Sequence, residues 1–117
     1  PAWNKEIVGG GSKGHDAIQE FEIKAANASH PVMAGVPASF KITDELYNMI
    51  PDDSGTPIEV LATATSPKTG KTFPSIWVVK LPKARIVCIA PGHDARAHDL
   101  PEYKKLLQNA VNWALGK

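Results

Sequence analysis

The chain has 117 residues, a formal net charge of +1 from 13 basic and 12 acidic side chains, and 43% hydrophobic residues. This length allows one small domain with a single core. No run of Lys or Arg stands out, so we expect neither a nucleic acid nor an anionic membrane as partner. No apolar stretch approaches the roughly 18 residues of a membrane-spanning helix. The single cysteine, Cys88, excludes an internal disulfide.

The first segment with a distinctive composition is "GGGSKGHD", residues 9–16. It has no strand or helix pattern, and we predict a flexible surface loop. A phosphate-binding loop is the less favoured alternative, because the Gly-Lys-Ser/Thr order of the Walker pattern is absent and a strand follows where a helix would be needed. The strand is "EFEIKAA", residues 20–26, whose apolar and polar side chains alternate as in a half-buried strand.

The middle of the chain continues with strands. A strand is predicted over residues 39–43, after the turn "HPVMAGVP". "DELYNMI", residues 44–50, could be a short helix capped by Asp44, or it could present a polar site. Pro82 marks a turn between the last two strands, which we predict to be a hairpin. Three segments rich in β-branched residues are predicted strands: residues 57–65, 75–80 and 84–90.

The end of the chain has the pattern of an amphipathic helix over residues 100–115. Asp99 is the predicted N-cap, Pro101 lies in the first turn, and Gly116 lies at the C-terminal stop. The apolar residues at helical spacing are Leu100, Tyr103, Leu107, Ala110, Val111 and Ala114.

About five strands and one strong helix leave two architectures open. A parallel sheet needs crossover helices, and this chain has too few to cover both faces of one. The chain is therefore either an α+β domain or the second half of a larger α/β domain. Residues 58–64 and 85–90 are nearly all apolar, as in strands covered on both faces. One helix covers one face, so we expect an apolar patch on the other, which could pair with a second copy in a homo-oligomer.

Polar side chains follow two of the predicted strands. Asp44, Glu45 and Tyr47 come after the strand that ends at residue 43, and "PGHD" places His93 and Asp94 after the last strand. Ligands in open α/β sheets bind beyond the carboxyl ends of strands. We therefore expect Asp44 or Glu45 to approach His93 at one end of the sheet. The alternative, with equal weight, is that these side chains cap a helix or a turn.

Two other chemistries are less favoured. A zinc site built from His15, His30 and His93 has no support in the spacing of these residues, so we predict no metal site. Cys88 lies in the middle of an apolar strand, where a buried structural cysteine is favoured over a catalytic thiolate. We also predict no cofactor.

Four sequence blocks, taken in order, resemble the ThuA-like family, which is named for trehalose utilisation. A strand ending in Gly-His and a last helix ending in Trp-Ala-x-Gly are part of that pattern. The stretch "GGGSKGHD" also resembles the Gly-Gly…Gly-His segment upstream of these blocks. The four blocks are "HPVMAGVPASFKITDELY" (residues 30–47), "FPSIW" (73–77), "ARIVCIAPGHD" (84–94) and "LLQNAVNWALG" (106–116).

This resemblance implies an α/β fold, a flavodoxin-like three-layer sandwich related to class I glutamine amidotransferases. Residues 1–117 would form the C-terminal portion of that domain, with its N-terminal half missing. The implied role is in carbohydrate metabolism, on a disaccharide such as trehalose or on its oxidised derivative. If the parent is an enzyme, it would be hydrolase-like or related. A glutaminase triad is not expected, because Cys88 is in the middle of a strand.

The predicted site gathers polar residues in one pocket for a small-molecule sugar. His93 would transfer protons, since an imidazole can titrate near neutral pH. Asp44 or Glu45 would orient it or bind sugar hydroxyls, and Tyr47 would hydrogen-bond to the sugar or stack on its ring. The predicted catalytic residues are His93, Asp94, Asp44 and Glu45, and the predicted substrate-binding residues are His30, Tyr47 and His15.

The alternative function is a non-catalytic carbohydrate-binding or interaction module. Such a module needs exposed aromatic side chains on a flat face. Only Trp3, Trp77 and Trp113 could supply them, so burial of all three would remove the platform.

Overall fold

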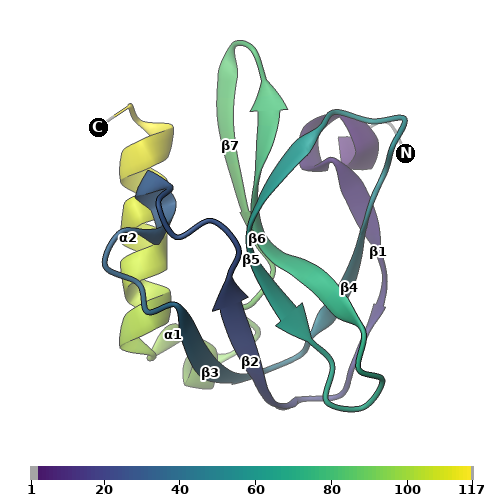
Figure 1. Cartoon of the computed structure of the whole chain (residues 1–117), viewed down its shortest axis with the longest axis vertical. Helices are drawn as coiled ribbons and strands as arrows, with labels where there is room; N and C mark the ends of the chain where they lie inside the picture. Colours follow the sequence, from purple (N-terminus) through teal and green to yellow (C-terminus); the bar gives the residue numbers. More distant parts are fainter. Residues whose placement is uncertain (1–2, 117) are drawn as a thin grey trace.

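The computed structural model of the chain describes residues 3–116, and Figure 1 shows its arrangement. The described residues form strands and short helices, and one long C-terminal helix packs against one side of the main sheet. In chain order the elements are η1 (Asn4–Val8), β1 (Gly10–His15), β2 (Gln19–Ala25), η2 (Pro31–Met33), β3 (Ser39–Asp44), β4 (Tyr47–Pro51), β5 (Ile58–Thr65), β6 (Thr72–Leu81), β7 (Ala84–Ile89), α1 (Ala95–His98) and α2 (Pro101–Ala114).

The main sheet has five strands in the order β3-β2-β5-β6-β7, and every neighbouring pair is antiparallel. The expected flavodoxin-like parallel sandwich is therefore wrong. The connections explain why: only Pro82 and Lys83 separate β6 from β7, and residues 66–71 separate β5 from β6. Turns this short reverse the chain, whereas a parallel pair needs a crossover of about a dozen residues or more. Of the two architectures that the residues left open, the α+β domain agrees with the structure.

A second, two-stranded sheet pairs β1 with β4 in antiparallel register, so that Gly11 lies opposite Ile50. One prediction and one of two open alternatives fail here. Residues 9–16 are not a loop, and residues 44–50 do not form a helix capped by Asp44. Both stretches have weak local preferences, and each gains its strand conformation by pairing its backbone with the other.

The main core lies between one face of the five-stranded sheet and the helical layer of η2, α1 and α2 (Figure 1). Helix α2 confirms the predicted helix and packs through Tyr103, Leu106 and Ala110. Its predicted N-cap is wrong: Asp99 ends α1, and Leu100 occupies the cap of α2 without a side-chain bond. None of the helices in residues 3–116 is long and apolar enough to span a bilayer.

The opposite face of the sheet is covered as well. Met49 of β4 packs on Trp77 and Val79 of β6, and all three side chains are buried. The expected uncovered patch on this face is therefore wrong, because the β1–β4 sheet occupies the place where we expected exposed apolar surface. This is why β6 can carry a run of buried residues that face both layers.

Candidate functional site

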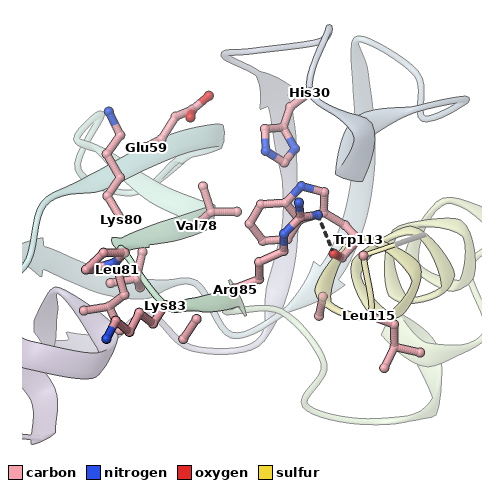
Figure 2. Close-up of a pocket in the computed structure, with 14 residues that line it drawn as sticks. His30, Glu59, Val78, Lys80, Leu81, Lys83, Arg85, Trp113 and Leu115 are labelled. Atoms are coloured by element: carbon pink, nitrogen blue, oxygen red, sulfur yellow. Dashed lines mark hydrogen bonds between the residues drawn. The ribbon is translucent and has the colours of Figure 1, made fainter.

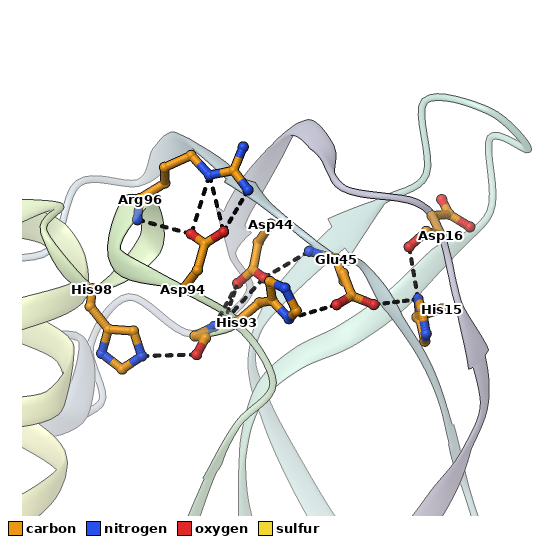
Figure 3. Close-up of polar contacts among 9 residues, drawn as sticks. His15, Asp16, Asp44, Glu45, His93, Asp94, Arg96 and His98 are labelled. Atoms are coloured by element: carbon orange, nitrogen blue, oxygen red, sulfur yellow. Dashed lines mark hydrogen bonds and ion pairs between the residues drawn. The ribbon is translucent and has the colours of Figure 1, made fainter.

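The centre of the site is the Glu45 carboxylate, which lies between two imidazoles (Figure 3). Its Oε1 is 2.6 Å from Nδ1 of His93, and its Oε2 is 2.6 Å from Nδ1 of His15. Only 11% of the Glu45 side chain is exposed, whereas 48% of His15 and 40% of His93 are exposed. The structure thus brings Glu45 to His93, as expected, and adds His15 on the other oxygen.

These contacts indicate which nitrogen of each neutral imidazole carries the proton. An ionised carboxylate only accepts hydrogen bonds, so the Nδ1 atoms of His15 and His93 donate to Glu45. Nδ1 of His15 also lies 2.9 Å from the carbonyl oxygen of Asp16, a second acceptor. In each neutral imidazole, Nε2 then carries the free lone pair. Glu45 therefore orients two imidazoles, each with an Nε2 that can take up a proton.

Asp44 approaches His93 through the backbone of that residue. Its side chain is buried at 1% exposure, and its carboxylate accepts the backbone N–H groups of Glu45, Gly92 and His93. Its hydrogen-bond partners are thus backbone groups and not the His93 ring. Asp44 joins the end of β3 to the loop after β7, and this connection places Glu45 opposite His93.

Asp94 caps the following helix, α1. Its carboxylate accepts the backbone N–H of Arg96 as the cap of α1 and also pairs with the Arg96 guanidinium. The hydrogen bond from that guanidinium is the main reason why the pKa of Asp94 is lowered from 3.8. The Asp94 carboxylate is thus already paired with Arg96. Its contacts agree with the alternative in which it caps a helix or a turn.

Asp16 and His98, which the sequence analysis did not single out, anchor the segments that carry His15 and His93. The Asp16 carboxylate accepts hydrogen bonds from the Ser66 hydroxyl at 2.6 Å and from Gln19 at 3.3 Å, which anchors the end of β1. Nε2 of His98 lies 2.8 Å from the carbonyl oxygen of Gly92. A repeat could have pointed to this arrangement, because Gly-His-Asp occurs at both 14–16 and 92–94.

The turn before His93 is closely packed. Gly92 has φ +130°, and a Cβ there would lie 2.5 Å from the Tyr103 hydroxyl, so the position requires glycine. The Tyr103 hydroxyl donates to the Pro91 carbonyl at 3.4 Å. Burial, and secondarily the negative charge of Asp44, raises the pKa of Tyr103 above 10.0. Helix α2 thereby supports the loop that carries His93.

The remaining predicted residues divide between two places. Tyr47 lies beside the site, with its ring edge-on to His15 at 5.4 Å between centroids, and 36% of it is exposed. His30 does not join the site. Its Nδ1 accepts the backbone N–H of Val32 as the cap of η2, and its ring lies edge-on to Trp113.

His30 instead lines a groove between the β6–β7 hairpin and the end of α2, with a volume of about 570 Å³ (Figure 2). In this groove the Arg85 guanidinium lies 5.0 Å from the centre of the Trp113 ring and donates to the Trp113 carbonyl. The zinc alternative of His15, His30 and His93 is therefore not assembled. Within residues 3–116 no three His, Cys, Asp or Glu side chains gather as a metal site.

The tryptophans do not form one platform. Trp77 is buried between the two sheets and donates its indole N–H to the Val8 carbonyl. Trp113, on α2, lies against Arg85, and Trp3, which precedes η1, is 65% exposed. They occupy separate elements, which does not favour a flat carbohydrate-binding face.

Comparison with known proteins finds structures that are similar to this chain. The chain resembles the crystal structure of a ThuA-like protein from Parabacteroides merdae, with 27% identity and a TM-score of 0.75, over 86% of this chain and 40% of that one. It also resembles a ThuA-like protein from Bacteroides uniformis, with 26% identity and a TM-score of 0.77, over 98% of this chain and 51% of that one. The chain thus spans about half the length of these relatives or less.

The comparison with curated proteins found no match. The family described as "ThuA: Trehalose utilisation" matches residues 1–114. Because that match covers nearly the whole sequence, the chain belongs to the ThuA family.

Proposed function

We propose that this chain carries the proton-transfer site of a sugar-acting enzyme, in which His93 is the general acid–base and Glu45 orients it. The observation that carries the proposal is the Glu45 carboxylate, 2.6 Å from both imidazoles. A carboxylate that accepts the Nδ1 proton holds an imidazole in one tautomer and stabilises the imidazolium that forms when Nε2 takes a second proton.

The chemistry follows from that arrangement. Nε2 of His93 takes a proton from a sugar hydroxyl, or from a carbon next to the carbonyl of an oxidised sugar. The resulting positive charge lies beside the Glu45 carboxylate, and the proton returns to the substrate or its leaving group. His15, bound to the other oxygen of Glu45, can transfer a proton as a second imidazole. The family's link with trehalose utilisation supports a disaccharide or its oxidised derivative as the substrate.

The contacts of the other carboxylates support imidazole chemistry over a two-carboxylate glycosidase mechanism. That mechanism needs two available carboxyl groups flanking the glycosidic bond. Asp44 is buried and accepts three backbone N–H groups, and Asp94 is paired with Arg96. Glu45 is the remaining predicted carboxylate, and it accepts from two histidines.

The test uses the purified protein with trehalose and with a disaccharide in which one ring hydroxyl is oxidised to a ketone. Proton NMR in D₂O reports exchange next to the ketone, and mass spectrometry reports products. His93→Gln and Glu45→Gln should each lower the rate by about a hundredfold or more. Glu20→Gln, at an exposed position of β2, is the matched control. An unchanged rate in a folded His93→Gln protein would overturn the proposal.

A further inference from the structure

A β-bulge in β1 interrupts the regular pairing with β4 just before His15. The ladder pairs Ser12 with Met49 and then His15 with Tyr47, so two residues of β1 oppose one residue of β4. Gly14, in the bulge, has φ +132°, and the Ser12 hydroxyl donates to its carbonyl at 2.7 Å. A bulge bends its strand and turns nearby side chains to a new direction. The β1–β4 ladder alone therefore does not fix the position of His15.

Asp16 provides further contacts that fix this position. Its backbone N–H donates to the carbonyl of Leu46, the residue after Glu45, at 2.9 Å. Its own carbonyl lies 2.9 Å from Nδ1 of His15, and that nitrogen also lies 2.6 Å from Glu45. Its carboxylate accepts the Ser66 hydroxyl at 2.6 Å. Because Glu45 and Asp16 supply the two acceptors at Nδ1, a shift of Asp16 moves the imidazole relative to Glu45.

Ser66 lies directly after β5, where the turn of residues 66–71 begins, and only 1% of it is exposed. Its side-chain oxygen accepts the backbone N–H groups of Lys68 at 3.2 Å and of Thr69 at 3.1 Å. A serine hydroxyl has one proton, and here that proton goes to the Asp16 carboxylate. A hydrogen bond from a hydroxyl to a carboxylate is charge-assisted and stronger than one between neutral groups. The turn, Ser66 and Asp16 therefore form one hydrogen-bonded unit.

We infer that Ser66 is a positioning residue for the second imidazole of the site: through Asp16, it holds Nδ1 of His15 against Glu45. The turn between β5 and β6 thereby becomes part of the site, although it acts on His15 indirectly. That the position of His15 affects a reaction rate rests on the proposed function. The hydrogen-bonded connection from Ser66 to His15 does not.

A single hydroxyl group tests this connection. Ser66→Ala removes it and leaves the Asp16 carboxylate without its charge-assisted donor, so that Gln19, at 3.3 Å, is the remaining side-chain donor of the pair. Thr65→Val is the matched control. It removes a hydroxyl one position earlier in the chain, which is exposed and pairs with Thr72 at 2.8 Å.

The measurement is nitrogen-15 NMR of the histidine rings at about pH 9, which shows which ring nitrogen carries the proton. In the wild type, His15 and His93 should both carry it on Nδ1, because Glu45 accepts from both. Once Nδ1 leaves Glu45, the bond that selects this tautomer is lost. In Ser66→Ala the ratio of the Nδ1–H to the Nε2–H form of His15 should fall about tenfold. His93 should keep its tautomer, and Thr65→Val should change neither ring.

An unchanged ratio for His15 in folded Ser66→Ala would overturn the inference. An equal change at His93 would overturn it as well, because it would show a general loosening of the site. If Ser66→Ala does not fold, Asp16→Ala tests the same connection at a partly exposed position, where an unchanged His15 ratio would again overturn it. Asp16→Asn keeps an oxygen acceptor for the Ser66 hydroxyl and should retain most of the wild-type ratio.

Turnover tests the role of this position in the reaction. On the disaccharides of the proposed function, Ser66→Ala should lower kcat about tenfold and leave KM nearly unchanged, because it displaces a proton-transfer group. A changed His15 tautomer with an unchanged kcat would overturn the positioning role. The proposed function fails separately: if His93→Gln keeps its full rate, the proton-transfer role is wrong, and the His15 tautomer still decides whether Ser66 holds that ring.

Discussion

The Asp44 carboxylate accepts the backbone N–H of Gly92 at 2.5 Å, across 48 positions of the sequence. The same carboxylate accepts the N–H of His93 and of its own neighbour, Glu45. One buried side chain thus sets the backbone on both sides of the Glu45–His93 contact. The positions of the Glu45 and His93 side chains thus depend on a residue that hydrogen-bonds to the backbone of both.

Asp44→Asn should lower the free energy of unfolding by about 2–3 kcal/mol. Hydrogen bonds to a charged acceptor are stronger than neutral ones, and the asparagine NH₂ would confront a backbone N–H that has lost its acceptor. Urea unfolding followed by circular dichroism measures the change. Asp53→Asn, at an exposed position, is the control. If both variants lose the same small amount, Asp44 does not hold the two loops together.

Local sequence patterns predicted the elements that have strong preferences of their own. Residues at helical spacing gave α2 to within a residue of each predicted end, and β-branched runs gave β5, β6 and β7. They failed for β1, where Gly10, Gly11 and Gly14 disfavour a strand in isolation. Pairing with β4 overrides that preference, and neither partner signals the other locally.

The candidate site was predicted only in part, because one of the strands that carry it was not predicted. His93 and Glu45 each follow a strand end, which pointed to one shared edge. His15 was assigned only from a resemblance, because the strand that carries it was not predicted. His30 was misplaced, since nothing local distinguishes a histidine that caps a helix, as this one caps η2, from one that faces a ligand.

The Asp94–Arg96 ion pair should give a pH dependence confined to acid. Arg96 lowers the pKa of Asp94 below its ordinary 3.8, so the pair stabilises the fold fully above that value. The contribution is lost as the pH falls through the lowered folded pKa. The difference in melting temperature between the wild type and Asp94→Asn should therefore be constant from pH 5 upward and shrink below about pH 4.

Carbon-13 NMR of the Asp94 carboxyl provides the check. In Arg96→Gln the main cause of the shift is removed, so the Asp94 pKa should rise toward 3.8. A titration of Asp94 that is the same in both proteins would contradict the ion-pair account.

Cys88 should react slowly with thiol reagents in the folded protein. Burial raises its pKa above 9.0, and the thiolate is the reactive form. Ellman's reagent at pH 8 should modify Cys88 at least about fivefold more slowly in buffer than in 6 M urea. Equal rates in the two solvents, with circular dichroism confirming the fold in buffer, would show an accessible and activated thiol.

Gly10→Ala should separate β1 from β4, the two strands that cover the second face of the main sheet. A Cβ at Gly10 would collide with the Ile50 carbonyl oxygen and lie 2.8 Å from Cε of Met49. The backbone of β4 cannot yield as a flexible side chain would, so β1 must move away from it. We expect a loss of about 1–3 kcal/mol, as for other overpacked sites.

Separation of β1 from β4 would also expose the apolar surface at Met49 and Trp77. Gly10→Ala should therefore bind a hydrophobic dye more strongly than the wild type and shift the Trp77 fluorescence to longer wavelength. Gly11→Ala is the matched control, because its Cβ meets only the Asn4 amide, at an ordinary 3.6 Å. If Gly10→Ala melts and binds dye as Gly11→Ala does, then close pairing of β1 with β4 is not what covers this face.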